Sequence, residues 1–270
     1  MRVGAVQMSS QDRVHENLAR AELLVAEAAQ RGADLVCLPE GFAYLGQETG
    51  RRELAEVRGG DGTIQSAVSS WARRHGTHVL AGGMPIVSPD PNRPYNTSLL
   101  FGPGGTLLAS YDKVHIFDVA LDDGTVLSES VATTAGSDIV VVDGPGARLG
   151  LSICYDLRFP ELFQQQRARG AEVCALTAAF TETTGQAHWH VLLRARAIET
   201  QCFVVAAAQV GTHGPSRRTF GHSLVVDPWG RLLAELEAGE GVVTADIDLD
   251  VLYSVRRQMP VWQHRRVLGS

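Results

Sequence analysis

The stretch Arg148-Leu-Gly-Leu-Ser-Ile-Cys-Tyr-Asp-Leu-Arg-Phe-Pro-Glu161 joins a short apolar run to a turn and the start of a helix. A run such as Leu149–Ile153 is typical of a buried strand, and a proline such as Pro160 is typical of the first helical position. Cys154 therefore falls at a strand-to-helix turn, where the helix N-terminus favours a thiolate and a nearby oxyanion. A strand that leads directly into a helix predicts an α/β protein.

Working outward from this stretch, the same alternation of apolar runs and amphipathic segments continues on both sides. We expect strands at 3–8, 34–38, 78–86, 97–101, 107–110, 139–142, 148–153, 172–177, 203–208, 223–226, 232–234 and 242–247. Helices are expected at 14–31, 63–75, 160–169, 187–201 and 248–257, a polar loop at 112–130 and a tail at 259–270. Since no Pro/Gly/Ser-rich linker and no repeat interrupts the series, we expect a single domain over residues 1–270.

The composition excludes several classes of protein. The net charge of −6 argues against a protein that binds the nucleic-acid backbone, which needs a basic surface. No apolar run reaches the roughly 20 residues of a membrane span, so no membrane partner is expected. The cysteines at 37, 154, 174 and 202 are scattered and form no Cys-x-x-Cys pair. This pattern favours a reduced, cytoplasmic protein over a disulfide framework or a zinc site.

Two reactive side chains directly follow expected strands. Glu40 follows 34–38, and Cys154 follows 148–153. Ligands of α/β sheets bind beyond the carboxyl ends of strands, so these two residues are candidates for a site. The other cysteines lie within strands or at a strand start and are expected to be small buried hydrophobic residues. Position alone leaves open whether Cys154 is catalytic.

Three segments carry a resemblance to a known family. They are Leu38-Pro-Glu40-Gly-Phe42, Tyr111-Asp-Lys113-Val-His-Ile-Phe-Asp118 and Ile153-Cys154-Tyr-Asp-Leu-Arg-Phe-Pro-Glu161. In sequence and order they resemble the signature segments of the nitrilase superfamily, whose members hydrolyse carbon–nitrogen bonds. The resemblance implies a four-layer αββα sandwich, an amide substrate, no cofactor and a homodimer.

The resemblance also implies a role for each residue. Cys154 would be the nucleophile and Glu40 the base that takes its proton, as the attack on a poorly electrophilic amide requires. Lys113 would hold the oxyanion together with the backbone N–H of Tyr155. Glu129 would contact the lysine, although an exposed loop carboxylate is the alternative for this residue.

Two downstream segments narrow the resemblance. Residues 185–201 and 221–230 resemble the branch that contains omega-amidase and deaminated glutathione amidase, and residues 206–213 favour the latter. Both enzymes take a 2-oxo acid with a distal amide; the leaving group is ammonia in the first and cysteinylglycine in the second. Gln186 and Val210 depart from the pattern of the branch and leave the exact substrate open.

A 2-oxo-carboxylate calls for a guanidinium that binds it bidentately. Arg158 is the candidate, with Phe180 as a pocket wall and Thr184 as a hydroxyl donor. The alternative for Arg158 is an ion pair with Asp156 or Glu161 at the start of the helix.

Other functions and contacts stay open at this stage. His188 and His190 would face different directions on a helix, so no metal is expected there, and His222 is as readily a core imidazole. The rival functions are omega-amidase or another small aliphatic amidase, an idle dimeric scaffold, and a thiol redox protein, for which no resolving cysteine lies near Cys154 in sequence. The dimer would form through the helix after Cys154 and the helix at 187–201, with Trp262–Arg266 reaching the partner or packing on its own subunit.

Overall fold

Two halves of one mixed sheet face each other in the computed structural model, which describes residues 1–120, 126–215 and 217–266. The first half contains β1 (Arg2–Met8), β2 (Leu35–Cys37), β3 (His78–Ile86), β4 (Tyr95–Phe101), β5 (Leu107–Asp112) and β15 (Gly241–Asp246). The second half contains β8 (Val141–Asp143), β9 (Arg148–Ile153), β10 (Val173–Ala178), β11 (Phe203–His213), β13 (Ser223–Val226) and β14 (Leu232–Leu236). A short parallel pairing of Gln7 and Met8 with Ala208 and Gln209 joins the halves.

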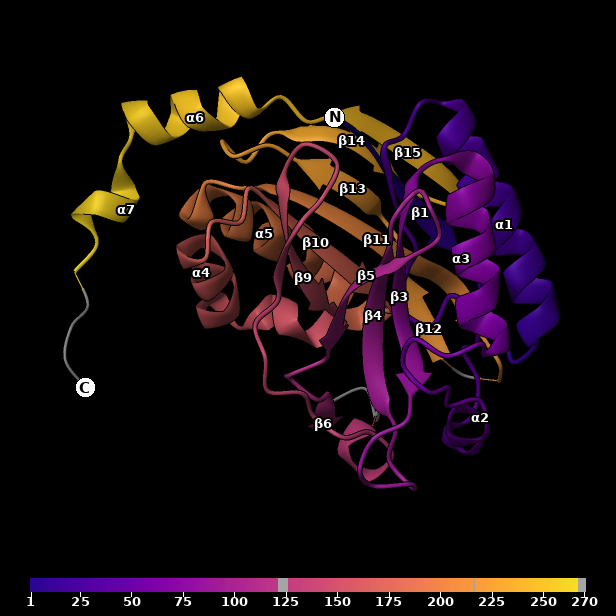
Figure 1. Cartoon of the computed structure of the whole chain (residues 1–270). Coiled ribbons are helices and arrows are strands. Elements are labelled where there is room, and N and C mark those ends of the chain that lie inside the picture. The colour runs from indigo at the N-terminus through magenta and orange to yellow at the C-terminus, as the bar shows by residue number, and fades with distance from the viewer. Residues whose placement is uncertain (121–125, 216, 267–270) are drawn as a thin grey trace.

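Helices cover the outer face of each half (Figure 1). The first half is covered by α1 (Val14–Gln30) and α3 (Thr63–His75), and the second by α4 (Pro160–Ala168) and α5 (Glu182–Thr200). The order helix, sheet, sheet, helix is the expected four-layer αββα sandwich, and the α/β class is confirmed. None of the helices in the described ranges is long and apolar enough to cross a membrane.

The apolar spacing of each helix explains this layering. In α1 the residues Leu18, Ala21, Leu24 and Val25 fall on one face, as the 3.6-residue period requires, and all are buried against the sheet. The α3 helix ends at Gly76, which adopts the left-handed conformation with φ 63° that a C-terminal cap needs. Both helices therefore have a defined face and a defined end.

The two sheet halves come into close contact beside a bulge in β3. The register of β3 shifts between Ala81 and Met84, and this irregularity contains Gly82 and Gly83. A Cβ on Gly82 would lie 2.4 Å from both the Leu38 carbonyl oxygen and the Thr177 Cβ. Glycine is therefore required where β2, β3 and the opposite strand β10 meet.

Parallel pairing sets where the strand ends lie. In the first half β1, β2 and β3 run parallel, and in the second half β9, β10 and β11 do the same. The carboxyl ends of parallel strands meet at one edge of their sheet. The loops after β2 and β9 are thus placed for shared chemistry.

Most of the expected elements are found, with α3, β3, β9 and β13 at their expected bounds. The expected loop at 112–130 instead contains the hairpin strands β6 (Asp118–Ala120) and β7 (Val126–Ser128) and the short helix η1 (Glu129–Val131). Also unforeseen are α2 (Glu48–Glu53), β12 (Arg217–Phe220) and α7 (Val261–His264), which follows the expected C-terminal helix α6 (Leu249–Gln258). Residues 121–125 of the loop and 267–270 of the tail lie outside the described residues.

The α5 helix begins at Glu182 instead of residue 187. Its first turn, Glu-Thr-Thr-Gly, has low helix propensity, and for this reason the sequence pattern did not predict that the helix begins there. Tertiary packing compensates, because Gly185 lies so near Phe220 that a Cβ would come within 2.3 Å of the Phe220 Cβ. The early start places Thr184 on a helix.

Candidate active site

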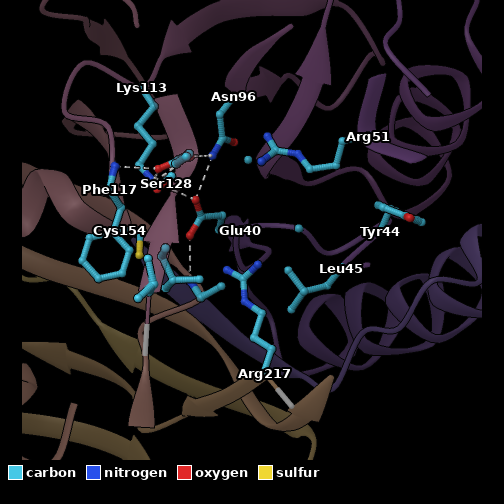
Figure 2. Close-up of a pocket in the computed structure, with 16 residues that line it drawn as sticks. Glu40, Tyr44, Leu45, Arg51, Asn96, Lys113, Phe117, Ser128, Cys154 and Arg217 are labelled. Carbon is cyan, nitrogen blue, oxygen red and sulfur yellow. Dashed lines mark hydrogen bonds and ion pairs between the residues drawn. The ribbon is translucent and has the colours of Figure 1, made fainter. Parts of the chain in front are cut away.

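Three expected catalytic residues stand just after strand ends and line one cavity of about 190 Å³ (Figure 2). Glu40 follows β2, Lys113 follows β5 and Cys154 follows β9. Their exposed fractions are 6%, 2% and 6%. Segments far apart in sequence thus bring a thiol, a carboxyl group and an amine together in a largely buried place.

The turn at Cys154 is held in an unusual conformation. Cys154 has φ 50°, a left-handed value that costs a residue with a Cβ about 1–2 kcal/mol. The buried Asp156 carboxylate stabilises the turn by accepting hydrogen bonds from the Ile153 N–H at 2.8 Å, the Tyr111 hydroxyl at 2.7 Å and the His115 N–H at 3.1 Å. Because Tyr111 and His115 flank Lys113, Asp156 ties the cysteine turn to the lysine segment.

Lys113 lies between two carboxylates. Its Nζ donates to Glu129 Oε2 at 2.8 Å and to Glu40 Oε1 at 3.1 Å. Glu129 also accepts from the Phe117 N–H at 2.9 Å. The alternative of an exposed loop carboxylate is wrong for Glu129, whose side chain is 12% exposed. Glu129 fixes the position of the lysine amine.

Glu40 is fixed through both carboxylate oxygens. Oε1 accepts from Asn96 Nδ2 at 2.8 Å in addition to Lys113, and Oε2 accepts from the Ala179 N–H at 2.9 Å. Gly83 packs against the side chain, since a Cβ at that position would lie 2.6 Å from Glu40 Cγ. The carboxylate therefore has little freedom to turn.

Charge and burial set the protonation states of the three groups. Burial alone would raise the pKa of Glu40, but the charges of Lys113 and Arg217 outweigh it and hold this pKa below the ordinary value. Burial also opposes the charge on Lys113, yet the carboxylates of Glu129 and Glu40 raise its pKa. Burial and the Glu40 charge raise the pKa of Cys154 well above its ordinary value. The resting site holds a thiol, a carboxylate and an ammonium.

The four residues expected to bind substrate gather in a second, smaller recess that also reaches Cys154. Its lining consists of Phe117, Cys154, Tyr155, Arg158, Phe180, Thr181 and Thr184. Arg158 Nη1 lies 3.1 Å from His188 Nδ1, and the guanidinium lies 5.1 Å from the centre of the Phe180 ring. The Asp156 partner considered for Arg158 is bonded to Tyr111 and His115 instead.

Sequence reasoning missed several residues of the main cavity. Asn96, on β4, bonds both Glu40 and Glu129, and its only signal was a polar amide just before the expected strand at 97–101. Arg51 and Arg217 come from α2 and β12, neither of which was expected. The Arg217 guanidinium turns toward Glu40, and the Arg51 guanidinium turns toward Asn96 (Figure 2). The role of Gly83 was missed because a pair of glycines in a strand does not indicate which side chain packs against them.

The remaining cysteines lie away from this chemistry. Cys37, Cys174 and Cys202 are fully buried, as expected of small hydrophobic residues. Burial raises the pKa of the Cys37 thiol to about 12, which makes it inert. The Cys202 Sγ donates to the carbonyl oxygen of Ala171 at 3.2 Å.

One group of side chains has the composition of a metal site. His190 Nε2 and His222 Nδ1 each lie 2.6 Å from the same oxygen, Oε1 of Glu235. The carboxylate comes from β14, so sequence spacing did not reveal it. His188 points instead to Arg158, as expected for helix positions two apart. The cluster does not line the cavity around Cys154.

Comparisons with known proteins agree with this geometry. A family model described as carbon-nitrogen hydrolase matches residues 2–257. A Synechocystis sp. protein named deaminated glutathione amidase is 45% identical over 97% of this chain and 96% of that protein. The solved structure of the Caenorhabditis elegans NitFhit protein has a TM-score of 0.92 and 40% identity, covering 98% of this chain and 65% of that one. Saccharomyces cerevisiae Nit3, from branch 10 of the nitrilase superfamily, has a TM-score of 0.89 and 31% identity, covering 99% and 97%.

Proposed function

The chain belongs to the carbon-nitrogen hydrolase family, and we propose that it is an amidase that hydrolyses deaminated glutathione through a thioester on Cys154. The observation that carries the proposal is the placement of Glu40, Lys113 and Cys154 in one cavity. The relatives that bear the name deaminated glutathione amidase support the choice of substrate. The predicted resemblance to the nitrilase superfamily is confirmed.

The proposed reaction begins with proton transfer. Cys154 gives its proton to Glu40 while the sulfur attacks the amide carbon, and the carbonyl π electrons move to oxygen. The Lys113 ammonium and the backbone N–H of Tyr155 hold the oxyanion. When the oxyanion collapses, the C–N bond breaks and Glu40 protonates the departing amine. Water then attacks the thioester, losing a proton to Glu40, and the proton returns to sulfur as the acid leaves.

The electrostatics explain why Lys113 is needed. Moving a proton from a thiol with a raised pKa to a carboxylate with a lowered pKa is unfavourable by itself. The transfer becomes feasible when it accompanies formation of an oxyanion beside the fixed Lys113 charge. Two carboxylates keep that amine protonated and in place. The site is therefore built for a substrate that develops negative charge only during attack.

We propose that the smaller recess binds the 2-oxo-acid end of the substrate. Arg158 would bind the 2-oxo-carboxylate, Phe180 would pack against the acyl chain and Thr184 would donate a hydrogen bond. In support, all three line the recess beside Cys154, and the Arg158 side chain is already oriented by His188.

A release assay tests the function. Purified protein would be mixed separately with deaminated glutathione, 2-oxoglutaramate and a simple aliphatic amide, and liberated 2-oxoglutarate or ammonia measured, with Cys154→Ala as the blank. We expect the highest kcat/KM for deaminated glutathione. A higher value for 2-oxoglutaramate would make the protein an omega-amidase. Turnover of none of the amides would leave the idle scaffold as the better account.

We also propose a homodimer through the outer face of α5. Val191 and Ile198 are large exposed apolar side chains on that helix, and Trp229 is exposed on the turn beside it. Trp262 lies 5.4 Å from the Arg167 guanidinium, which supports packing of the C-terminal segment on its own subunit. Light scattering coupled to size exclusion should give twice the 29.0 kDa chain mass. A monomer at micromolar concentration would contradict the dimer.

Two further expectations remain proposals. A single domain over the whole chain is supported by the shared 13-stranded sheet of the described residues. A reduced, cytoplasmic location is supported by the four free, buried cysteines.

A further inference from the structure

Two hollows reach Cys154, and they differ in chemistry. The main cavity is lined by Glu40 and Lys113 as well as Cys154. The smaller recess, which contains Arg158, is lined by neither of them. The recess has a volume of only about 10 Å³, so its side chains must move apart before the acyl end of a substrate enters it, whereas the main cavity of about 190 Å³ is open. The two ends of a substrate whose amide carbon lies at the sulfur then meet different side chains.

The reaction decides which end enters which hollow. The departing nitrogen must receive its proton from the general acid, which requires hydrogen-bond contact between the two. Glu40 is the proposed acid and lines only the main cavity. The amine part of the substrate therefore lies in the main cavity, and the acyl part lies in the recess.

The size of the main cavity does not suit ammonia. A cavity can hold one water molecule, which is close to ammonia in size, once its volume reaches about 10–15 Å³. The main cavity of about 190 Å³ is more than ten times as large. A leaving group of several non-hydrogen atoms fits this space better.

The charges of the main cavity favour an anion. Its lining contains three cations, Arg51, Lys113 and Arg217, and two anions, Glu40 and Glu129, both of which are bonded to Lys113. The guanidinium of Arg217 turns toward Glu40 (Figure 2), and its buried Nε has no hydrogen-bond partner in the described part of the chain. A buried donor without a partner is costly unless a ligand accepts from it.

We propose that the main cavity is a leaving-group subsite for a short peptide amine, with Arg217, assisted by Arg51, binding the peptide's terminal carboxylate. This rests on the proposed function, because the amine released from deaminated glutathione is a dipeptide with one carboxylate.

A binding titration tests the subsite without turnover. Cys154→Ala protein would be titrated by calorimetry with deaminated glutathione and with the same molecule carrying a C-terminal carboxamide. We expect the carboxylate form to bind about ten- to a hundredfold more tightly, as for one charged hydrogen-bonded pair. Adding Arg217→Gln should abolish this preference. Equal affinities in the parent, or a preference that survives in Arg217→Gln, would overturn the proposal.

The neighbouring residue provides a matched control. Arg218 lies on the same strand, but its guanidinium points to Glu182 at 2.7 Å and its side chain is 64% exposed. Arg218→Gln removes the same charge from the same strand outside the main cavity. The preference for the carboxylate form should persist in this variant. If it fell as far as in Arg217→Gln, a long-range charge effect would replace the direct contact.

A kinetic ratio separates this proposal from the proposed function. With Cys154 intact, the ratio of kcat/KM for deaminated glutathione to that for 2-oxoglutaramate should fall about ten- to a hundredfold in Arg217→Gln. Both substrates share the acyl part, so any effect of Arg217 on Glu40 cancels in the ratio. An unchanged ratio would overturn the proposed leaving-group subsite but leave the proposed function standing. If wild-type protein did not hydrolyse deaminated glutathione, the proposed function would fail, and the titration would still decide whether Arg217 binds the carboxylate.

Discussion

Replacing Gly83 with alanine should damage the site through the position of Glu40. The new Cβ would lie 2.6 Å from Glu40 Cγ and 2.9 Å from Asn96 Oδ1. Carbon atoms in contact prefer about 3.5–4.0 Å, so the Glu40 side chain must move by about 1 Å. Bonds to Asn96, Lys113 and Ala179 hold both carboxylate oxygens and prevent a compensating rotation. A misplacement of this size costs about a hundredfold in rate.

The free energy of unfolding should fall in Gly83→Ala as well. A second variant, Gly76→Ala, separates the cost of backbone strain from the cost of overpacking. Gly83 has φ 57°, where alanine costs about 1–2 kcal/mol, and the overpacking adds about 1–3 kcal/mol. Gly76 has φ 63°, but a Cβ added there would meet nothing within 4 Å, so Gly76→Ala carries only the backbone cost. At about 2–4 °C per kcal/mol, Gly76→Ala should lower the Tm by about 2–8 °C and Gly83→Ala by more.

The assay is kcat/KM for deaminated glutathione together with thermal unfolding. Gly76→Ala should keep wild-type kcat/KM despite its lower Tm, whereas Gly83→Ala should lose about a hundredfold at a temperature where both are folded. If Gly83→Ala retained activity within about threefold of Gly76→Ala, the packing of Glu40 against residue 83 would not control catalysis.

Further outcomes follow from the site. Cys154→Ala should abolish turnover yet keep the fold, checked by circular dichroism; residual turnover would exclude the nucleophile. Lys113→Ala should lower kcat by about 10²–10³ and also reduce the Tm, because Glu40 and Glu129 lose their shared cation. Since the pKa of Glu40 is lowered, its stabilising contribution is present above the unfolded value of about 4.3 and is lost as pH falls through the folded pKa. The acid limb of kcat/KM should therefore lie below pH ~4.3, and a limb near pH 6 would refute the assignment. Arg158→Lys should lower kcat/KM about ten- to a hundredfold on 2-oxo-acid amides and little on neutral amides, because lysine lacks the two-donor fork; equal losses would mean that Arg158 only shapes the turn.

The sequence was most informative where local pattern and chemistry coincide. Cys154 and Glu40 stand directly after apolar strands, so the period of those strands and the rule for strand ends made them candidates, and the resemblance to the nitrilase superfamily supplied their roles. Lys113 and Glu129 had no such signal, because they belong to the polar segment expected to be a loop. Only the resemblance to the nitrilase superfamily pointed to them, and their contact in the structure is a product of tertiary folding.

Residues that depend on distant packing were not predictable. Arg217 lies on β12, a strand that exists because it pairs with the extended end of β11, which local pattern placed at Ala208 and the structure at His213. Arg51 lies on a helix of six polar residues, too short for periodicity to detect. The side chains proposed to bind the leaving group are thus the ones that local sequence patterns predict least well.

The bonds of Asp156 have a consequence for partly folded chains. Asp156 belongs to the second half of the sheet, whereas Tyr111 and His115 belong to the first. The bond from the Ile153 N–H lies within one half, but the bonds from Tyr111 and His115 to Asp156 form only after the halves have docked. An incompletely folded molecule carries an ordinary cysteine without a base or an oxyanion donor beside it. Hydrolytic activity therefore requires that the two halves of the sheet have docked.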